Sequence, residues 1–560
     1  MIKTQEDEVI NSLKNKDNSQ TTTQEETLSR AQEHYQELFT PRQRPPNKEP
    51  AKIPNIGKSR SLIKAFSLPT VKKALSKLKS KKASGPDGIP NEALKLGAKE
   101  ISPPLRKAFN LLLLTGESIP AWAEGIMYLI YKGKGDITDL NNYRGITVNN
   151  SISKLFASLL NDRLSKLVEK RGVLGQVQNG GRGNRQGLDS IFILRTILEK
   201  GLGKGKTAHK DLSLLFLDLA KAFDKVPHDL LWEKLYRMGF HPSFLKILKS
   251  LYKDTYVKVM INGWASEKVF TRSGVKQGCP LSPLLWALFI SDIGLLLEQS
   301  PGGVLIWGQR ISALLFVDDM VIIGRNKAEI KRIIIQCQFQ FELSGLEINF
   351  SKSKILSRHD MEQDNMTITS QMGVTIGDLE CKEKYKYLGV TLNMGARSSD
   401  IFKFQRDTLV SRLKSYAGLI LLMAKESFDP IEVGEAMWKS MALEAVLYGI
   451  QTISVSEQIL TKLDYIQAKF AADLLQVNRS CSHVGLLREL GWVSISSIVA
   501  KRKLVYWTRL CSLNEDNWAR KAVEDCLSAN YPAQRKISIT NIIFFKLMIQ
   551  ILLNIFPNLI

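Results

Sequence analysis

Apolar and polar residues are distributed so that the chain separates into a polar start, a mixed middle and a helical end. Residues 1–60 are polar apart from one helical pattern around residues 27–39, which is followed by a Pro-rich linker. Beyond residue 68, short apolar runs typical of strands are interleaved with amphipathic stretches typical of helices. This interleaving predicts an α+β fold. The strand-like runs are residues 213–219, 256–261, 312–323 and 386–392, and clear helical stretches between them are residues 228–239 and 328–345.

Two adjacent aspartates, Asp318 and Asp319, interrupt the apolar run "LLFVDDMVII" at residues 314–323. Burying an unpaired carboxylate costs several kcal/mol, and two adjacent carboxylates repel each other. Two interpretations remain open at this point. The pair lies in a hairpin turn and faces solvent, or it binds a cation, most simply a divalent metal ion.

A third aspartate, Asp218, closes the apolar run at residues 213–219. An aspartate at this kind of boundary is often a helix N-cap, and that interpretation suffices for Asp224 and Asp229 further on. If the strands are neighbours, however, Asp218 converges with Asp318 and Asp319. Mg²⁺, which prefers hard oxygen ligands and substrate phosphates, would relieve their repulsion. Two such ions can activate an attacking hydroxyl and stabilise a leaving phosphate.

A loop and a helix lie between these acids, in "GVKQGCPLSPLLWALFISDI" at residues 274–293. Gly278 and the prolines indicate the loop, and Ser282 is expected at or near the helix cap. Such a loop lets the backbone approach a flat ligand such as a template base. A tight loop that enters a buried helix would explain the same residues.

Composition narrows the function classes. The 560 residues are enough for three or four domains, and 44% of them are apolar, which excludes a wholly disordered chain. Lys and Arg total 78 and Asp and Glu total 55, a net charge of +23. That excess points to a polyanionic partner, first of all nucleic acid, although an unspecialised basic protein is the alternative.

Cysteine spacing and the two termini bear on the compartment. The six cysteines are scattered without a Cys-x-x-Cys pair, which argues against a disulfide framework or a zinc finger and favours a reducing compartment. The N-terminus carries no secretory signal. Residues 541–560 are long enough to span a bilayer, but their polar residues recur about every four positions. We therefore expect a packed amphipathic helix there and no stable membrane association.

The order of these features resembles the palm of reverse transcriptases, specifically those of LINE-type non-LTR retrotransposons. Asp218 in a strand comes first, the Gly-Pro loop with its helix second, and the apolar-flanked Asp-Asp pair third. The likeness covers roughly residues 30–510. Further segments that resemble motifs of this family are "KKASGPDGIPNEALK" (81–95), "NNYRGITVNNSISKLFASLLNDRL" (141–164), "GQVQNGGRGNRQGLDSIFIL" (175–194), "GLEINFSKSKIL" (345–356) and "YKYLGVTL" (385–392).

The resemblance implies a right-hand polymerase with fingers, a palm containing an antiparallel sheet, and a helical thumb. Its activity would be RNA-directed DNA synthesis with two Mg²⁺ ions, copying element RNA into DNA from a DNA 3′ end. The implied partners are an RNA template, a DNA primer or target and dNTPs, and the implied location is nucleus and cytoplasm. The expected domains are a polar N-terminal segment and linker (1–60), N-terminal extension and fingers (61–210), palm (211–395), thumb-like region (396–510) and helical tail (511–560).

Carried over by position, the resemblance assigns a role to each matching residue. The metal ligands would be Asp218, Asp318, Asp319 and the backbone of Leu219. The incoming nucleotide would meet Arg182, Gln277, Gly278 and Phe223, the last as an aromatic gate against a ribose 2′-hydroxyl. Lys352 would protonate the leaving pyrophosphate, and the template and primer would contact Arg144, Lys154, Tyr387, Leu388 and Gly389.

Simpler interpretations exist for some of these residues. Phe223 fits an amphipathic pattern and is explained equally well as core. Lys352 and Lys354 fit an ordinary solvated loop, and Arg182 with Arg185 fits a nonspecific phosphate clamp. The aspartate triad is the part that is hardest to explain otherwise.

Departures from the family pattern define the alternatives. The family more often has an aromatic residue at Gly181 and an alanine at Val317, where a viral RNA polymerase would more usually have glycine. The chain begins in what resembles the linker ahead of the polymerase, so we expect it to lack the upstream endonuclease. The remaining alternatives are a group II intron-like enzyme, against which the absence of a maturase-like or HNH tail argues, and a domesticated nucleic-acid-binding remnant without polymerase activity.

Overall fold

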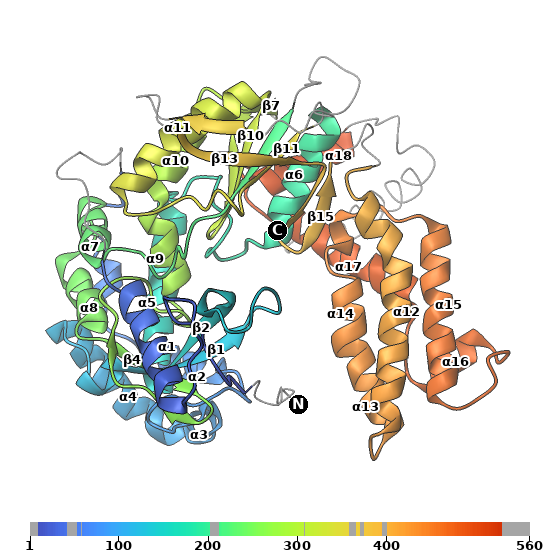
Figure 1. The fold of residues 1–560 in the computed structure, drawn as a ribbon, viewed down its shortest axis with the longest axis horizontal. Helices are drawn as coiled ribbons and strands as arrows, with labels where there is room; N and C mark the ends of the chain where they lie inside the picture. Colours follow the sequence, from blue (N-terminus) through green and yellow to red (C-terminus); the bar gives the residue numbers. More distant parts are fainter. Residues whose placement is uncertain are drawn as a thin grey trace. The chain divides into compact units, whose positions relative to one another are not determined.

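The computed structural model describes residues 9–41, 53–57, 59–201, 212–306, 308–357, 366–369, 375–394 and 400–528. The chain forms two compact units that exchange segments along the sequence. Unit 1 consists of Met1–Gly183, Asp218–Gln299 and Ile334–Asn349, and unit 2 of Asn184–Leu217, Ser300–Ile333 and Phe350–Ile560. The elements of both units are labelled in Figure 1. The five-part division expected from the sequence stays a prediction.

Unit 1 is built around a five-stranded sheet in the order β2-β1-β4-β5, with β6 also paired to β4. The pairs are antiparallel except for β1 with β4, which is parallel. Helix α1 (Gln24–Leu38) begins with a capping box formed by Thr23 and Glu26. Its residues Ala31 and Tyr35 pack against apolar side chains of β1 and β4, which ties the N-terminal segment to the sheet. The strands are β1 (Glu124–Tyr131), β2 (Tyr143–Asn149), β4 (Tyr256–Ile261), β5 (Trp264–Ala265) and β6 (Val269–Phe270).

The remaining helices of unit 1 carry buried apolar side chains. Helix α9 is apolar on every side and almost all of its residues are buried, as expected for a helix enclosed by protein. The predicted helix at residues 228–239 is confirmed as α7. These helices are α2 (Leu68–Ser76), α3 (Asn91–Leu96), α4 (Ala98–Thr115), α5 (Ser151–Arg171), α7 (His228–Arg237), α8 (Pro242–Tyr252), α9 (Ser282–Phe289) and α10 (Ser291–Gln299).

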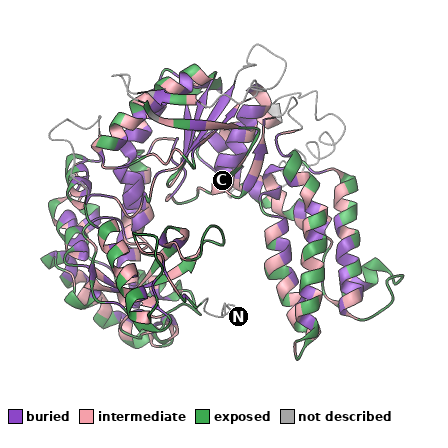
Figure 2. Ribbon diagram, viewed as in Figure 1, coloured by how far each residue is buried: buried purple, intermediate pink, exposed green. Residues whose placement is uncertain are grey.

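Unit 2 contains a six-stranded sheet in the order β12-β13-β11-β3-β10-β9. All five residues of its inner strand β3 are buried, which explains the continuous apolar run in the sequence (Figure 2). The sheet is antiparallel apart from the parallel pair β11–β13, so the expected antiparallel sheet is present with one exception. The strands are β3 (Ser213–Leu217), β9 (Ala313–Phe316), β10 (Asp319–Gly324), β11 (Lys354–Ser357), β12 (Met366–Thr369) and β13 (Thr375–Lys382).

Two of the runs that the sequence predicts as single strands fold into hairpins of two strands each. The run at residues 312–323 folds into β9 and β10, which are joined by Val317 and Asp318. The run at 386–392 folds into β14 (Lys384–Tyr387) and β15 (Val390–Asn393), joined by Leu388 and Gly389. In the second turn both linking residues have positive φ, 45° and 84°, as a two-residue type I′ turn requires. A further small hairpin consists of β7 (Val304–Ile306) and β8 (Gln309–Ile311).

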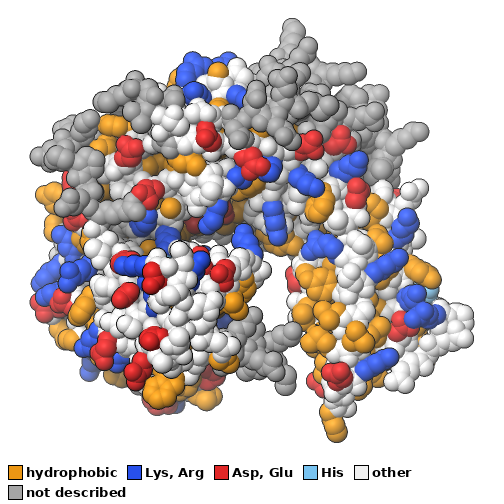
Figure 3. Space-filling view, viewed as in Figure 1, with side chains coloured by type: hydrophobic (Ala, Val, Ile, Leu, Met, Phe, Trp, Pro, Cys, Tyr) orange, Lys and Arg blue, Asp and Glu red, His pale blue; other side chains and the backbone are white. Residues whose placement is uncertain are grey.

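The end of the described chain is helical, as the sequence predicts. Figure 3 shows apolar side chains over α12 and α13. The exposed large apolar residues of these helices and of the loop between them are Phe404, Leu419, Leu422, Phe428 and Ile431. The other helices of unit 2 and the boundary helix α11 are α6 (Gly187–Gly201), α11 (Lys327–Leu343), α12 (Lys403–Lys425), α13 (Pro430–Met437), α14 (Leu443–Val446), α15 (Glu457–Leu474), α16 (His483–Glu489), α17 (Ile495–Cys511) and α18 (Trp518–Ser528).

Two expectations about chemistry and membranes can be compared with the fold. All six cysteines are free, in agreement with the expected absence of a disulfide framework. Within the described part of the chain, no helix is both long and apolar enough to cross a bilayer. The predicted amphipathic helix at 541–560 lies outside the described residues.

Candidate active site

Asp318 and Asp319 occupy the hairpin between β9 and β10. Both are exposed, and Asp319 pairs with Phe316 across the turn. The preceding Val317 has a φ of 61°, a conformation that a β-branched residue adopts only at a steric cost. The hairpin interpretation is therefore correct about their location, and the expected burial cost is absent. A tight turn with an unfavourable residue holds two carboxylates at the end of a buried strand, which is compatible with a ligand site.

The strands that carry the acids are neighbours, as the sequence analysis required. Strand β10 pairs with β3 in an antiparallel register that places Met320 opposite Leu217. Asp319 immediately precedes Met320, and Asp218 immediately follows Leu217. The register therefore directs both carboxylate-bearing positions to the same end of this strand pair.

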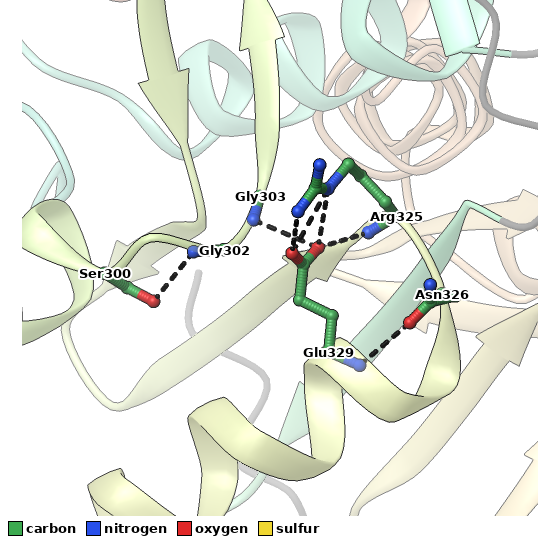
Figure 4. Close-up of polar contacts among 6 residues, drawn as sticks. All are labelled: Ser300, Gly302, Gly303, Arg325, Asn326 and Glu329. Carbon is green, nitrogen blue, oxygen red and sulfur yellow. Dashed lines mark hydrogen bonds and ion pairs between the residues drawn. The ribbon is translucent and has the colours of Figure 1, made fainter.

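The other end of β10 is anchored by a buried carboxylate (Figure 4). The side chain of Glu329 is 4% exposed and accepts hydrogen bonds from the backbone N–H groups of Gly303 (3.2 Å) and Arg325 (2.7 Å). The Arg325 guanidinium donates to the same carboxylate over 2.7 Å. Burial opposes ionisation, but these donors outweigh it and lower the pKa of Glu329. The cluster fixes the exit of β10 to the loop before β7.

Asp218 begins the turn after β3. It is partly buried, and its carbonyl accepts a hydrogen bond from the N–H of Asn349 (2.8 Å). The N–H of Ala220 donates to Glu347, so Leu219 and Ile348 form the pair between these two bonds. In an antiparallel ladder, the carbonyl of such a residue points away from its partner. The Leu219 carbonyl therefore points away from Ile348.

The loop at residues 273–277 lies along the turn at residues 223–228. The two segments run antiparallel, with Pro227 bridged to Ser273. A Cβ atom at Gly274 would lie 2.8 Å from the carbonyl oxygen of Asp224, so the close approach requires glycine. The joining hydrogen bonds are Ser273 Oγ to Asp224 O (3.0 Å), Gly274 N to Val226 O (2.8 Å), Val275 N to Phe223 O (2.8 Å) and His228 Nε2 to Gly274 O (2.7 Å).

Gln277 and Gly278 end this loop, and each is held by a different neighbour. The Gln277 Nε2 atom donates to Asp224 Oδ1 over 2.7 Å. Gly278 has a φ of 94°, and a Cβ atom there would lie 2.9 Å from the Thr147 carbonyl oxygen of β2. The loop therefore packs between the turn after β3 and strand β2 of the unit 1 sheet. Only glycine fits at position 278.

Two expectations about capping are wrong. Helix α7 has Pro227 as its N-cap, so neither Asp224 nor Asp229 caps it. Asp229 lies in its first turn, and Asp224 bonds Gln277 instead. Ser282 is the first residue of α9, directly after the N-cap Leu281, so the expectation that it lies at or near the cap is confirmed. Its Oγ donates to the Lys276 carbonyl (2.7 Å).

Burial perturbs two charged groups in this loop region. It raises the pKa of Asp224 to about 6, although the hydrogen bond from Gln277 and the charges of Lys221 and Lys132 act in the opposite direction. It lowers the pKa of Lys276 to about 8. Neither residue stands out as a functional group in the sequence, because the pattern around each is that of a cap or a loop. Perturbed groups beside a predicted nucleotide-binding loop are typical of functional sites.

Phe223 is half-buried in unit 1. Its ring stacks on Trp286 of α9, with centroids 5.5 Å apart and planes inclined by 20°. Since part of the side chain remains accessible while the other part contacts the core, both the gate and the core interpretations agree with this position.

The predicted basic contacts of unit 1 differ in environment. Arg144 is exposed on β2. Lys154 is half-buried near the start of α5, and burial lowers its pKa while Asp87 opposes that effect. The Arg182 side chain is only 4% exposed and pairs with Glu169 of α5 at 2.6 Å. It also donates to the carbonyls of Gly175 (2.5 Å) and Gln178 (3.0 Å), so its guanidinium holds the preceding loop together.

The other predicted residues belong to unit 2. Lys352 is exposed just before β11, whereas Lys354 is paired with Glu380 at 3.1 Å. Tyr387 is buried, and burial, aided by the negative charge of Asp319, raises its pKa well above the ordinary value. Leu388 and Gly389 form the β14–β15 turn, where the Tyr448 hydroxyl donates to the Leu388 carbonyl (3.0 Å). A Cβ atom at Gly389 would lie 2.8 Å from the Tyr448 ring.

The structure thus gathers the predicted residues in two groups. Unit 1 holds Arg144, Lys154, Arg182, Asp218, Leu219, Phe223, Gln277 and Gly278, and unit 2 holds Asp318, Asp319, Lys352, Tyr387, Leu388 and Gly389. Among the residues that the structure describes, no three His, Cys, Asp or Glu side chains form a ready metal cage. Carboxylate and carbonyl oxygens are ligands that hard divalent cations prefer, and such ions are often held by only one or two protein carboxylates.

Comparison with known proteins agrees with the predicted family. Residues 131–392 match the family described as reverse transcriptase (RNA-dependent DNA polymerase). A Xenopus laevis protein, the transposon TX1 uncharacterized 149 kDa protein, is 26% identical over 65% of this chain and 27% of its own length. The RNA-directed DNA polymerase from mobile element jockey of Drosophila melanogaster is 25% identical over 73% of this chain and 43% of its own length. The chain therefore spans less than half of either relative.

Solved structures give a weaker likeness. Apo telomerase from Candida tropicalis is 16% identical, with a TM-score of 0.36 over 75% of this chain and 74% of that one. A TM-score of 0.36 is too low to indicate a shared fold. The match to the reverse transcriptase family therefore rests on the sequence. The observed helices and sheets confirm the predicted α+β fold, and the sequence matches support a reverse transcriptase domain at residues 131–392.

Proposed function

We propose that this protein, which carries the reverse transcriptase domain of a LINE-type retroelement, is an RNA-directed DNA polymerase. It would copy element RNA into DNA by adding dNTPs to a DNA 3′ end. The observation that carries the proposal is the β3–β10 register, which directs Asp218 and Asp319 to the same end of two neighbouring strands. The net charge of +23 suits a polymerase that holds a template and a primer.

Asp218, Asp318 and Asp319 would be the catalytic carboxylates and would hold two Mg²⁺ ions, with the Leu219 carbonyl as a further ligand. When bound, these ions supply the charge that activates a primer 3′-hydroxyl and stabilises the leaving pyrophosphate. The chain's own contribution is to hold the acids in place. The Val317 turn and the Glu329 cluster at the two ends of β10 support that role.

The incoming dNTP would be held by residues of the loop at 273–278 and the turn at 223–228. Gln277 and Gly278 would contact the nascent base pair, and Phe223 would crowd a ribose 2′-hydroxyl. Arg182 is predicted to meet the triphosphate, and it would have to leave Glu169 to do so. Lys352, exposed before β11, would donate a proton to the leaving pyrophosphate.

The template and the primer are each proposed to meet residues named in the sequence analysis. Arg144 and Lys154 are proposed to meet the template, and the turn at residues 387–389 to grip the primer end. The Tyr448 contacts that fix this turn support a rigid gripping element. Action in the nucleus as well as presence in the cytoplasm is part of the same proposal.

A primer-extension assay tests the proposal. Purified protein is given an RNA template, an annealed DNA primer, dNTPs and Mg²⁺, and extension products are resolved by length. Asp218→Asn and Asp318→Asn should each abolish extension while RNA–DNA binding, followed by fluorescence anisotropy, stays nearly unchanged. Near-normal extension by either variant would refute the metal-site assignment.

A matched control is available in unit 1. Asp254 is exposed in a turn with a φ of 51°, a conformation that asparagine also adopts readily. Asp254→Asn should extend primers like the unmodified protein. If the unmodified protein binds the RNA–DNA hybrid but extends no primer under any divalent metal, the chain is the nucleic-acid-binding remnant named among the alternatives.

A further inference from the structure

We propose that Asp224 is a positioning residue for the polymerase reaction: it orients the Gln277 side chain so that the amide carbonyl oxygen, and not the NH₂ group, meets the incoming nucleotide. The inference rests on the proposed contact between Gln277 and the nucleotide. It adds a residue that the family resemblance does not assign and a direction for the hydrogen bond.

The geometry couples the two residues closely. Gln277 Nε2 donates to Asp224 Oδ1 at 2.7 Å, a short, charge-assisted distance. The backbones on either side are joined as well, since Val275 N donates to Phe223 O and Ser273 Oγ donates to Asp224 O. Asp224 therefore cannot move away without breaking the pairing of the loop and the turn.

The chemistry of a carboxylate decides which way the amide faces. An ionised carboxylate only accepts hydrogen bonds, whereas an amide has one donor end and one acceptor end. Asp224 therefore selects the NH₂ end of Gln277 for itself. The other end, Oε1, makes no hydrogen bond with the residues that the structure describes. That oxygen is left to accept a hydrogen bond from a ligand.

Asp224 and Gln277 line a cavity with Asn149 and Thr147 of the unit 1 sheet, and its volume is about 40 Å³. A space of this size holds roughly one water molecule. Asp224 is proposed to act only through its hydrogen bond with Gln277, which makes it a positioning residue and not a catalytic one.

The nucleotide groups that suit an acceptor are limited. Once the ring N–H groups of thymine and guanine are paired with the template, a dNTP can still donate from its 3′-hydroxyl or from the exocyclic amino group of A, C or G, whereas thymine has no amino group. The 3′-hydroxyl and the amino group would each donate a hydrogen bond to Gln277 Oε1. Measuring the incorporation of each nucleotide separately distinguishes these two donors.

Single-nucleotide incorporation by the full-length protein tests the inference, with KM and kcat measured for each dNTP and ddNTP. Asp224→Leu should raise KM by roughly three- to tenfold, the loss expected for one hydrogen bond, with little change in kcat. Asp224→Asn keeps an acceptor oxygen, so its KM should lie between the values of the unmodified protein and of Asp224→Leu. In a Gln277→Met background, Asp224→Leu should cause no further rise, because coupled residues are not additive. Glu347→Gln is the control, since Glu347 pairs with Lys225 on the outer side of the same turn (2.8 Å).

The outcomes separate this inference from the proposed function. If Gln277→Met leaves KM unchanged, the proposed nucleotide contact of Gln277 fails, and this inference fails with it. If Gln277→Met raises KM but Asp224→Leu does not, or if the two effects add, only the positioning role is refuted. A smaller preference for dNTPs over ddNTPs in Asp224→Leu supports the 3′-hydroxyl as donor. A loss that spares dTTP supports the base amino group, and an equal loss for all eight nucleotides overturns the acceptor role of Oε1.

Discussion

The ring of Phe223 stacks on the indole of Trp286, with centroids 5.5 Å apart. Trp286 is fully buried, while Phe223 stays half-buried at the start of the turn that carries Asp224. The indole thus fixes the orientation of a ring that keeps an accessible edge. A rigid apolar edge offers a sugar hydroxyl neither space nor a hydrogen bond.

We predict that Phe223→Val admits ribonucleotides with some loss of rate. A polar group left unpaired in such a site costs about 1–3 kcal/mol, and removal of the ring lifts both that cost and the steric clash. The measurement is the ratio of dNTP to rNTP incorporation beside the melting temperature. If the variant is well folded and its ratio of dNTP to rNTP incorporation is unchanged, Phe223 is a core residue and not a gate.

Phe289→Val is the matched control for the gate. Phe289 also packs against Trp286, at 6.1 Å between centroids, but it is completely buried. Its truncation should lower stability by a few kcal/mol through the cavity it leaves, with no change in sugar selection. A changed ratio in this control would show that general loosening of the core, and not the loss of a gate, alters selectivity.

Salt should weaken nucleic-acid binding steeply. Because the chain carries a net charge of +23, we expect several phosphate contacts, each releasing a counterion. Affinity for an RNA–DNA duplex should fall by on the order of 100-fold or more between about 50 and 200 mM salt, with little sequence preference. Anisotropy titrations with two unrelated duplexes of equal length measure both properties. A flat salt response would eliminate the electrostatic explanation.

Asp224→Asn should stabilise the protein above pH 6. Burial raises the pKa of Asp224 from 3.8 to about 6, so the folded state binds a proton that the unfolded state releases, and stability falls as pH rises through that window. The asparagine does not titrate, so the variant should gain at most about 3 kcal/mol at pH 7–8. The gain should shrink towards pH 4. Urea unfolding across pH 4–8 tests this, and a pH-independent difference would contradict it.

Glu329→Gln should destabilise the anchor of β10. The buried carboxylate accepts from two backbone N–H groups and from Arg325, and an amide placed there turns a donor towards donors. We expect a loss of about 1–3 kcal/mol. Because the folded-state pKa is lowered, the loss should persist above pH 5 and diminish as pH falls below about 4.5.

Glu342→Gln on the same helix is the control for this prediction. Glu342 is exposed and accepts a surface hydrogen bond of 3.0 Å from Gln338, so its replacement should change stability by about 0.5 kcal/mol or less. Equal losses in the two variants would show that the anchor is no more important than any helix-surface carboxylate.

Local pattern was enough to predict the strands and helices that are stabilised by their own residues. β3 and β4 were found because their apolar side chains require burial on a pleated surface, and α7 and α11 because their apolar positions recur with the helical period. The ordered aspartates and glycines were enough to point to the family that residues 131–392 match and to place Asp218 at the end of its strand.

Tertiary structure decided what those residues contact. The run at residues 312–323 reads as one strand, but pairing with β3 and with itself folds it around Val317 and exposes both aspartates. Arg182 reads as a phosphate clamp, yet Glu169 and two carbonyls surround its guanidinium. Asp224 reads as a cap, yet its partner Gln277 lies 53 residues away. A sequence pattern reports how a residue suits its immediate neighbours, whereas the partner of a polar side chain depends on which distant segments packing brings beside it.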